Sequence, residues 1–176
     1  RYHCLVEQPV LAIASNQTWF KVAPEENRVL GFFRTFDQYK YWMLHNHSCI
    51  DVDIPRLERG ETLLEIDVQF TPSSAILLRK TKLNGIVRTI IDEVHANGTA
   101  VHHLVISASM DFELIACGPG VLIHVEDEVI VQHRLDNGQT RRYPQQPELM
   151  KHVQGIARSD DGLLLITERQ IRRLIP

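Results

Sequence analysis

Residues 155–168 read GIARSDDGLLLITE and carry the pattern on which the fold prediction rests. Its middle, Asp160, Asp161 and Gly162, predicts a tight turn, because Asp bonds to nearby backbone and Gly adopts a positive φ. The apolar run at 163–166 follows at once and is typical of a strand buried on both faces. Residues 155–174 therefore predict three short strands joined by two turns.

The same phrase occurs four times: an apolar strand, a Ser or Thr, a few turn residues and a second apolar strand. Its anchors are Ser15, Thr71, Ser109 and Ser159, which lie 56, 38 and 50 residues apart. A third short strand follows each copy. Blade repeats run at roughly 40 to 50 residues. We therefore expect repeats at about 9–54, 63–100, 101–143 and 152–176.

The copies resemble the WD-repeat family of β-propellers, whose blades carry a Ser-Pro-Asp-Gly hairpin and then a strand ending in Trp-Asp. The segments TPSS (71–74) and SDDG (159–162) match the hairpin best, and the dipeptides at 36–37 and 91–92 stand where Trp-Asp falls. No copy carries the Trp. The resemblance implies an all-β fold of antiparallel four-stranded blades, and a non-catalytic scaffold for protein–protein interaction within a larger assembly.

The length of 176 residues suits one domain, 1–176, with the organisation of a β-propeller. A propeller needs roughly four to eight blades to close, and the repeats supply about three and a half. The chain begins with Arg rather than Met. We therefore expect it to be part of a longer protein or to be completed by a partner, and not to form a closed monomer alone.

A rival fold starts from Pro147 and Glu148, which suit the first turn of a helix. A curled sheet over 100–143 followed by a helix over 147–159 resembles the polo-box fold, in which two such α+β units dock partner proteins or phosphopeptides. Gly155 and the alternation of residues 153–156 favour a loop and then a strand. We therefore predict that 147–159 is not one helix.

Composition excludes several classes of protein. The net charge of −3 carries no general signal for nucleic-acid binding, and no apolar stretch approaches the length of a membrane span. Cys4, Cys49 and Cys117 are odd in number and widely spaced, so they predict no disulfide framework. Free thiols fit an intracellular compartment, and we expect a cytoplasmic or nuclear protein without a cofactor or a membrane partner.

Two groups of residues are candidates for a metal site or a catalytic site. His45, His47 and Cys49 alternate and would face one side of a strand, but the sequence offers no fourth zinc ligand at a telling distance. The acidic residues at 111, 113 and 126–128 are interpreted as solvated loop charge, because no nucleophile motif accompanies them. We predict neither a catalytic nor a metal site. A metal-dependent propeller hydrolase is the third hypothesis.

Arginine is enriched in the last third of the chain. Its guanidinium binds carboxylate and phosphate groups in a bidentate manner. This enrichment predicts a surface for other protein subunits or for acidic or phosphorylated peptides, with nucleic acid as a less favoured alternative. The candidate binding residues are Arg141, Arg142, Tyr143, His152, Arg172 and Arg173.

The repeat also makes a prediction about the core. Leu77, Leu114 and Leu164 share a place in the apolar run after a turn. We therefore expect them at equivalent buried positions of successive blades.

Overall fold

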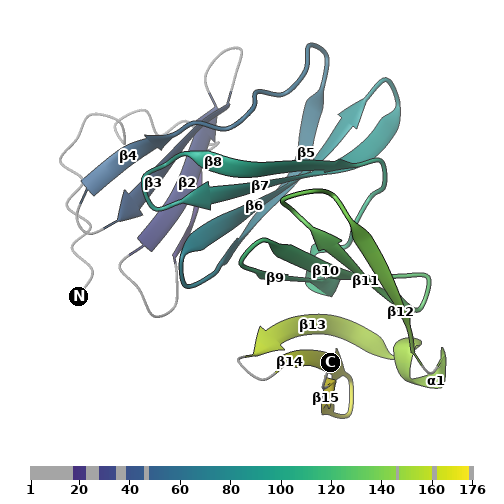
Figure 1. Cartoon of the computed structure of the whole chain (residues 1–176). Helices are drawn as coiled ribbons and strands as arrows, with labels where there is room; N and C mark the ends of the chain where they lie inside the picture. Colours follow the sequence, from purple (N-terminus) through teal and green to yellow (C-terminus); the bar gives the residue numbers. More distant parts are fainter. Residues whose placement is uncertain are drawn as a thin grey trace.

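The chain folds into four antiparallel sheets, each a meander in sequence order, in a computed structural model (Figure 1). The structure describes residues 18–22, 28–34, 39–45, 48–145, 147–159 and 162–174. The prediction of an all-β fold with antiparallel sheets is confirmed. The described sheets form a row rather than a closed ring, with the first and fourth sheets at opposite ends (Figure 1).

The first and second sheets have four strands each. The first contains β1 (Thr18–Val22), β2 (Arg28–Arg34), β3 (Tyr39–His45) and β4 (Ser48–Val52). The second contains β5 (Thr62–Phe70), β6 (Ser74–Leu83), β7 (Ile86–His95) and β8 (Ala100–Ile106). The turn between β6 and β7 has positive φ at Asn84 (50°) and Gly85 (84°), as the Asn-Gly signal predicts.

The third sheet also has four strands, and the fourth has three. A 3-10 turn, η2 (Phe112–Leu114), leads into β9 (Ile115–Gly118), β10 (Val121–Glu126), β11 (Val129–Arg134) and β12 (Thr140–Pro144). The one-turn helix α1 (Pro147–Met150) leads into β13 (Val153–Ser159), β14 (Gly162–Thr167) and β15 (Ile171–Leu174).

Consecutive sheets pack face to face through apolar layers, and β6 shows how. Ala75 and Leu77 belong to the layer between the first and second sheets, while Ile76 and Leu78 belong to the layer between the second and third. Successive side chains of a strand alternate between faces, so one strand serves both layers. All four side chains have no exposed surface.

The third layer lies between the third and fourth sheets. It is built on Leu163 and Leu165 of β14, which pack with Ile130, Ile156 and Met150. Because Met150 belongs to α1, the helical turn is tied to the same layer. The four sheets are therefore joined in sequence order by three separate cores.

The sheets correct the repeat pattern in one place. The residues at 101–106, expected to open the third repeat, belong to β8 and pair with β7 in the second sheet. The phrase anchored at Ser109 therefore connects two sheets and is not a hairpin. Leu114 accordingly lies in η2 and is half-buried, whereas Leu77 is fully buried in β6.

The helix that the polo-box alternative requires is not formed. α1 ends at Met150, and residues 153–159 are strand β13 paired with β14. The prediction that 147–159 is not one helix is confirmed, and the structure does not support the polo-box fold. Gly155 lies in β13 at a register shift, which suits a residue without a side chain.

Some predicted features lie outside the described residues. They are the anchor Ser15, the dipeptide at 36–37, and the turn residues Asp160 and Asp161. The strands on both sides of that turn pair up to Ser159 opposite Gly162, so the hairpin itself is confirmed. No helix within the described ranges is long and apolar enough to cross a membrane.

Candidate partner-binding site

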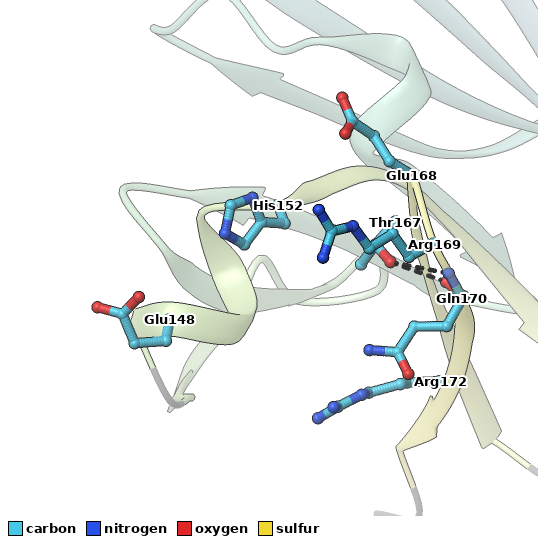
Figure 2. Close-up of a pocket in the computed structure, with 7 residues that line it drawn as sticks. All are labelled: Glu148, His152, Thr167, Glu168, Arg169, Gln170 and Arg172. Atoms are coloured by element: carbon cyan, nitrogen blue, oxygen red, sulfur yellow. Dashed lines mark hydrogen bonds between the residues drawn. The ribbon is translucent and has the colours of Figure 1, made fainter.

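A surface cavity of about 400 Å³ lies beside the fourth sheet, between α1 and the turn that joins β14 to β15 (Figure 2). Its lining residues are Glu148, His152, Thr167, Glu168, Arg169, Gln170 and Arg172. All of these but Thr167 are exposed. The cavity is therefore open to solvent, and its size falls within the usual range of ligand sites.

The turn from β14 to β15 is held by its own side chain. The Thr167 backbone N–H and hydroxyl both donate to the Gln170 carbonyl oxygen at 3.0 Å, and the Gln170 N–H donates to the hydroxyl at 3.2 Å. Thr71 and Ser74 make the same three contacts in the turn from β5 to β6. A closed turn of this kind presents its two middle residues outward, and Arg169 is one of them.

The acidic side chains of this cavity make hydrogen bonds within the protein, whereas two of its basic side chains make none to the described residues. Glu148 accepts from Lys151 at 3.0 Å, and Glu168 accepts from the Gln154 amide at 3.1 Å. In the part of the chain that the structure describes, neither Arg169 nor His152 has a hydrogen bond or ion pair. The cavity therefore contains hydrogen-bond donors of Arg169 and His152 that are available to a ligand, beside carboxylates that already have partners.

Arg172 contributes a second guanidinium. When the Gln170 amide is oriented with its oxygen toward Arg172, it accepts hydrogen bonds from Nε at 3.0 Å and Nη2 at 3.1 Å. Figure 2 shows the Arg169 side chain extending toward His152, with Arg172 farther along the same wall. The two arginines and His152 therefore line one opening.

The structure brings together only part of the predicted site. His152 and Arg172 line the same cavity, but Arg173 follows Arg172 on β15 and so points to the opposite face of the sheet. The other three predicted residues lie on β12, the edge strand of the third sheet, and do not line this cavity. They are Arg141, Arg142 and Tyr143.

The residues on β12 are also divided between faces. Arg142 forms an ion pair with Glu126, while the Tyr143 hydroxyl donates to Gln132 at 2.9 Å. Because neighbours on a strand alternate, these two side chains serve opposite faces. The predicted basic patch is therefore not one surface.

Sequence reasoning placed Arg169 among the arginines of the last third but not in the site. The signal that could have found it is Thr167 followed three residues later by Gln170, between two apolar strands. A Thr at the end of a strand favours a side-chain-closed turn, which exposes the residues inside it.

A pair of imidazoles lies on the third sheet, with His124 buried and His133 partly buried. The Nε2 atoms of His124 and His133 are 3.0 Å apart and the ring centroids 5.1 Å apart, so the rings meet at their nitrogen edges. Such a bond needs one donor and one acceptor, so two imidazolium ions cannot make it. Burial, followed by the charge of His133, lowers the pKa of His124 to about 4, and burial also lowers that of His133.

The three residues weighed as zinc ligands are only partly described. His47 lies outside the described residues, and Cys49 pairs with Leu44 rather than with His45 across β3 and β4. Within the described ranges, no three His, Cys, Asp or Glu residues gather as a metal ion requires.

No family model matches the chain, and no curated protein matches it. The class that the fold itself defines is an all-β protein of antiparallel meanders stacked in sequence order. Its function is therefore inferred from the residues and geometry of this chain alone.

Proposed function

We propose that this chain is a non-catalytic scaffold, a part of a WD-like β-propeller in a larger intracellular assembly, that binds acidic or phosphorylated peptide segments of its partners. The binding site is the cavity lined by His152, Arg169 and Arg172, which we name the α1 cavity. The proposal rests on the difference in hydrogen bonding between the acidic and the basic side chains of that cavity. Its carboxylates have hydrogen-bond partners, while Arg169 and His152 have none in the described residues.

Guanidinium groups suit this role because their planar donors match the oxygens of a carboxylate or phosphate. Arg169 stands on a turn that its own hydrogen bonds close, so a partner meets a preformed backbone. Preorganisation of this kind lowers the entropy lost on binding. An anion entering between Arg169 and Arg172 would satisfy the donors of Arg169, which have no partner among the described residues, and would compete with the Gln170 amide oxygen for those of Arg172.

The order of the sheets supports the propeller part of the proposal. Three of the four sheets have four antiparallel strands in sequence order, and each sheet packs on the next through an apolar layer. This is the organisation of consecutive propeller blades. A rigid stack of sheets that presents its turns at the edges suits the docking of peptides.

The test uses fluorescence anisotropy with two labelled peptides of one acidic sequence, one with phosphoserine and one with serine. We expect the phosphopeptide to bind more tightly. Arg169→Ala and Arg172→Ala should each weaken it by about tenfold or more, because hydrogen bonds to charged groups contribute about 1.5–3 kcal/mol. The salt dependence of binding should also fall in both variants.

Lys82→Ala is the matched control, because Lys82 is an exposed cation on β6, far from the α1 cavity in the sheet order. It should change the affinity less than twofold. Two results would contradict the proposed site. One is an equal loss of affinity in this control. The other is an affinity that is the same for both peptides and is unchanged in both arginine variants.

A further inference from the structure

The third sheet ends in an exposed strand, β12 (Thr140–Pro144), whose outer side we name the β12 edge. In the sheet order β12 stands last, and within the described ranges it pairs with β11 alone (Figure 1). All five of its residues are exposed. A strand edge of this kind presents backbone donors and acceptors to solvent and can pair with another extended chain.

The register of the hairpin tells which backbone groups of β12 point outward. Where the hairpin begins, the Arg134 N–H donates to the Gln139 carbonyl oxygen at 2.8 Å. Hydrogen-bonded and non-hydrogen-bonded pairs alternate along an antiparallel ladder, so Arg141 is the next residue of β12 that bonds to β11. The N–H and C=O groups of its two neighbours, Thr140 and Arg142, therefore face the β12 edge.

The side chains of β12 lie on both faces of the sheet. Arg141 and Tyr143 share the face of Ile130, which packs toward the fourth sheet, whereas Arg142 lies on the opposite face and forms an ion pair with Glu126. In the described part of the chain, Arg141 has no hydrogen bond or ion pair. A ligand on one face would meet only one guanidinium group. An added strand would meet both, because its own side chains alternate between faces.

The charge of the β12 edge decides what kind of chain fits it. Two guanidinium groups stand on adjacent residues at its centre, and the ion pair of Arg142 with Glu126 lies at the surface, where such pairs stabilise little. A second copy of β12 would bring arginine against arginine, and like charges opposite each other on a sheet are destabilising. The edge therefore favours an acidic strand over a second copy of itself.

The acidic positions of such a strand are limited by the far end of the edge. Pro144 has no N–H to donate, and it stands opposite Val129, next to the turn that carries the exposed residues Asp127 and Glu128. Carboxylates of a bound strand are repelled there. The favourable positions therefore lie opposite residues 140–142.

We propose that the β12 edge binds an extended acidic segment of a partner protein, which joins the third sheet as an additional strand. The segment bonds to the backbone of Thr140 and Arg142. One of two consecutive acidic side chains meets Arg141, and the next meets Arg142 on the other face. The residue opposite Tyr143 packs against its ring, which is 40% exposed. This site is separate from the α1 cavity and does not depend on the function proposed for that cavity.

The probe is the peptide TVEEVT, fluorescently labelled at one end and amidated at the other. Its sequence reads the same in both directions, so the test assumes no strand polarity. Fluorescence anisotropy with the whole chain should show saturable binding, and TVKKVT should bind about tenfold more weakly or worse, because its charges repel the two arginines. An oligothymidylate should not displace the peptide. Absence of saturable binding, or displacement by the oligothymidylate at equal concentration, overturns the proposal.

Backbone pairing is tested separately from charge. Two versions of TVEEVT carry N-methyl groups, one on its odd-numbered residues and the other on its even-numbered residues. An added strand bonds to its neighbour through every second residue, so one version should lose about tenfold or more in affinity and the other less than about threefold. Equal affinities of the two versions overturn the proposal.

Charge reversal on β12 locates the site. Arg141→Glu and Arg142→Glu should each weaken TVEEVT about tenfold or more. The double variant should bind TVKKVT more tightly than the parent chain does, a gain that a misfolded chain cannot produce. Lys82→Glu, the same reversal at an exposed residue of β6, and Arg169→Ala in the α1 cavity should each change the affinity for TVEEVT less than about twofold. A loss in Arg169→Ala without one in the β12 variants, or no gain for TVKKVT in the double variant, overturns the proposal.

Discussion

The second and fourth sheets contain nearly the same apolar run, yet the two strands are buried differently. In β6, residues 75–78 read AILL and are fully buried on both faces. In β14, residues 163–166 read LLLI, but only Leu163 and Leu165 are buried, Leu164 is half-buried and Ile166 is 36% exposed. The second sheet has a neighbour on each side, and the fourth has one described neighbour.

An apolar run therefore predicts a strand but not how many faces of that strand are covered. The two sheets also differ in their polar groups. Arg79 and Asp92 form a buried ion pair in the second sheet, whereas the charged residues of the fourth sheet's turn are exposed. The comparison therefore predicts larger energetic effects in the second sheet than in the fourth.

The largest effect is expected for Asp92→Asn in the second sheet. It leaves the Arg79 guanidinium buried without its carboxylate, and breaking a buried pair costs about 3–5 kcal/mol. Chemical denaturation of the whole chain measures the free energy of unfolding. The counterpart in the fourth sheet is Glu168→Gln, which should change it by less than about 0.5 kcal/mol. Equal losses would contradict the contrast.

Truncation of the apolar strands should give the next largest difference. Leu77→Ala removes a fully buried side chain and should cost about 2–5 kcal/mol. Leu164→Ala removes a half-buried one and should cost about 1 kcal/mol. A loss at Leu164 as large as that at Leu77 would mean that the outer face of the fourth sheet is covered in solution.

The histidine pair of the third sheet should make stability depend on pH. The His124 pKa is about 4 in the folded chain, against 6.5 for an ordinary histidine, so the unfolded chain binds the proton first as pH falls. The stabilising contribution is complete above pH 6.5 and is lost toward pH 4. Its size is about 1–3 kcal/mol. His124→Gln should remove most of this slope in denaturation curves from pH 7 to pH 4, and an unchanged slope would assign it to other groups.

The smallest effect on folding is expected for Ile171→Ser, because Ile171 is 67% exposed on the last strand. The free energy of unfolding should change by less than about 0.5 kcal/mol. Self-association should change more, since β15 presents a strand edge and Ile166 and Ile171 are both exposed. Sedimentation should show concentration-dependent association of the parent chain and less of it in the variant. A compact, concentration-independent monomer with protected edge amides would contradict this.

Local features of the fold could be read from the sequence. The Asn-Gly turn at 84–85 and the hairpin around Asp160 depend on backbone preferences of a few neighbouring residues, and both hairpins form where expected. The predicted boundary between the second and third repeats was wrong. The last strand of one sheet and the first strand of the next have the same alternation of apolar and polar residues, so the sequence does not tell them apart. Only pairing with β7 assigns β8 to the second sheet.

The candidate site could be predicted only in part. His152 and Arg172 were both among the predicted residues, and Arg172 follows from the arginine enrichment, but the pattern does not say which side chains share a face. Arg172 and Arg173 are adjacent and point apart, while Arg172 and His152 are twenty residues apart in the sequence and line one cavity. The turn at 167–170 places the side chains of this cavity, and its hydrogen bonds form only when β14 and β15 are paired.

By itself the sequence determined that this protein is built from short antiparallel strands, where most of its hairpins turn, and that its last third is rich in guanidinium groups. These properties follow from φ preferences and from side-chain alternation, which act over a few residues. Which sheet faces are covered depends on the tertiary structure, and so does the contact between the Tyr41 ring and the Arg79 guanidinium. Residues 38 positions apart in sequence meet only after two sheets have packed, and no local pattern encodes that meeting.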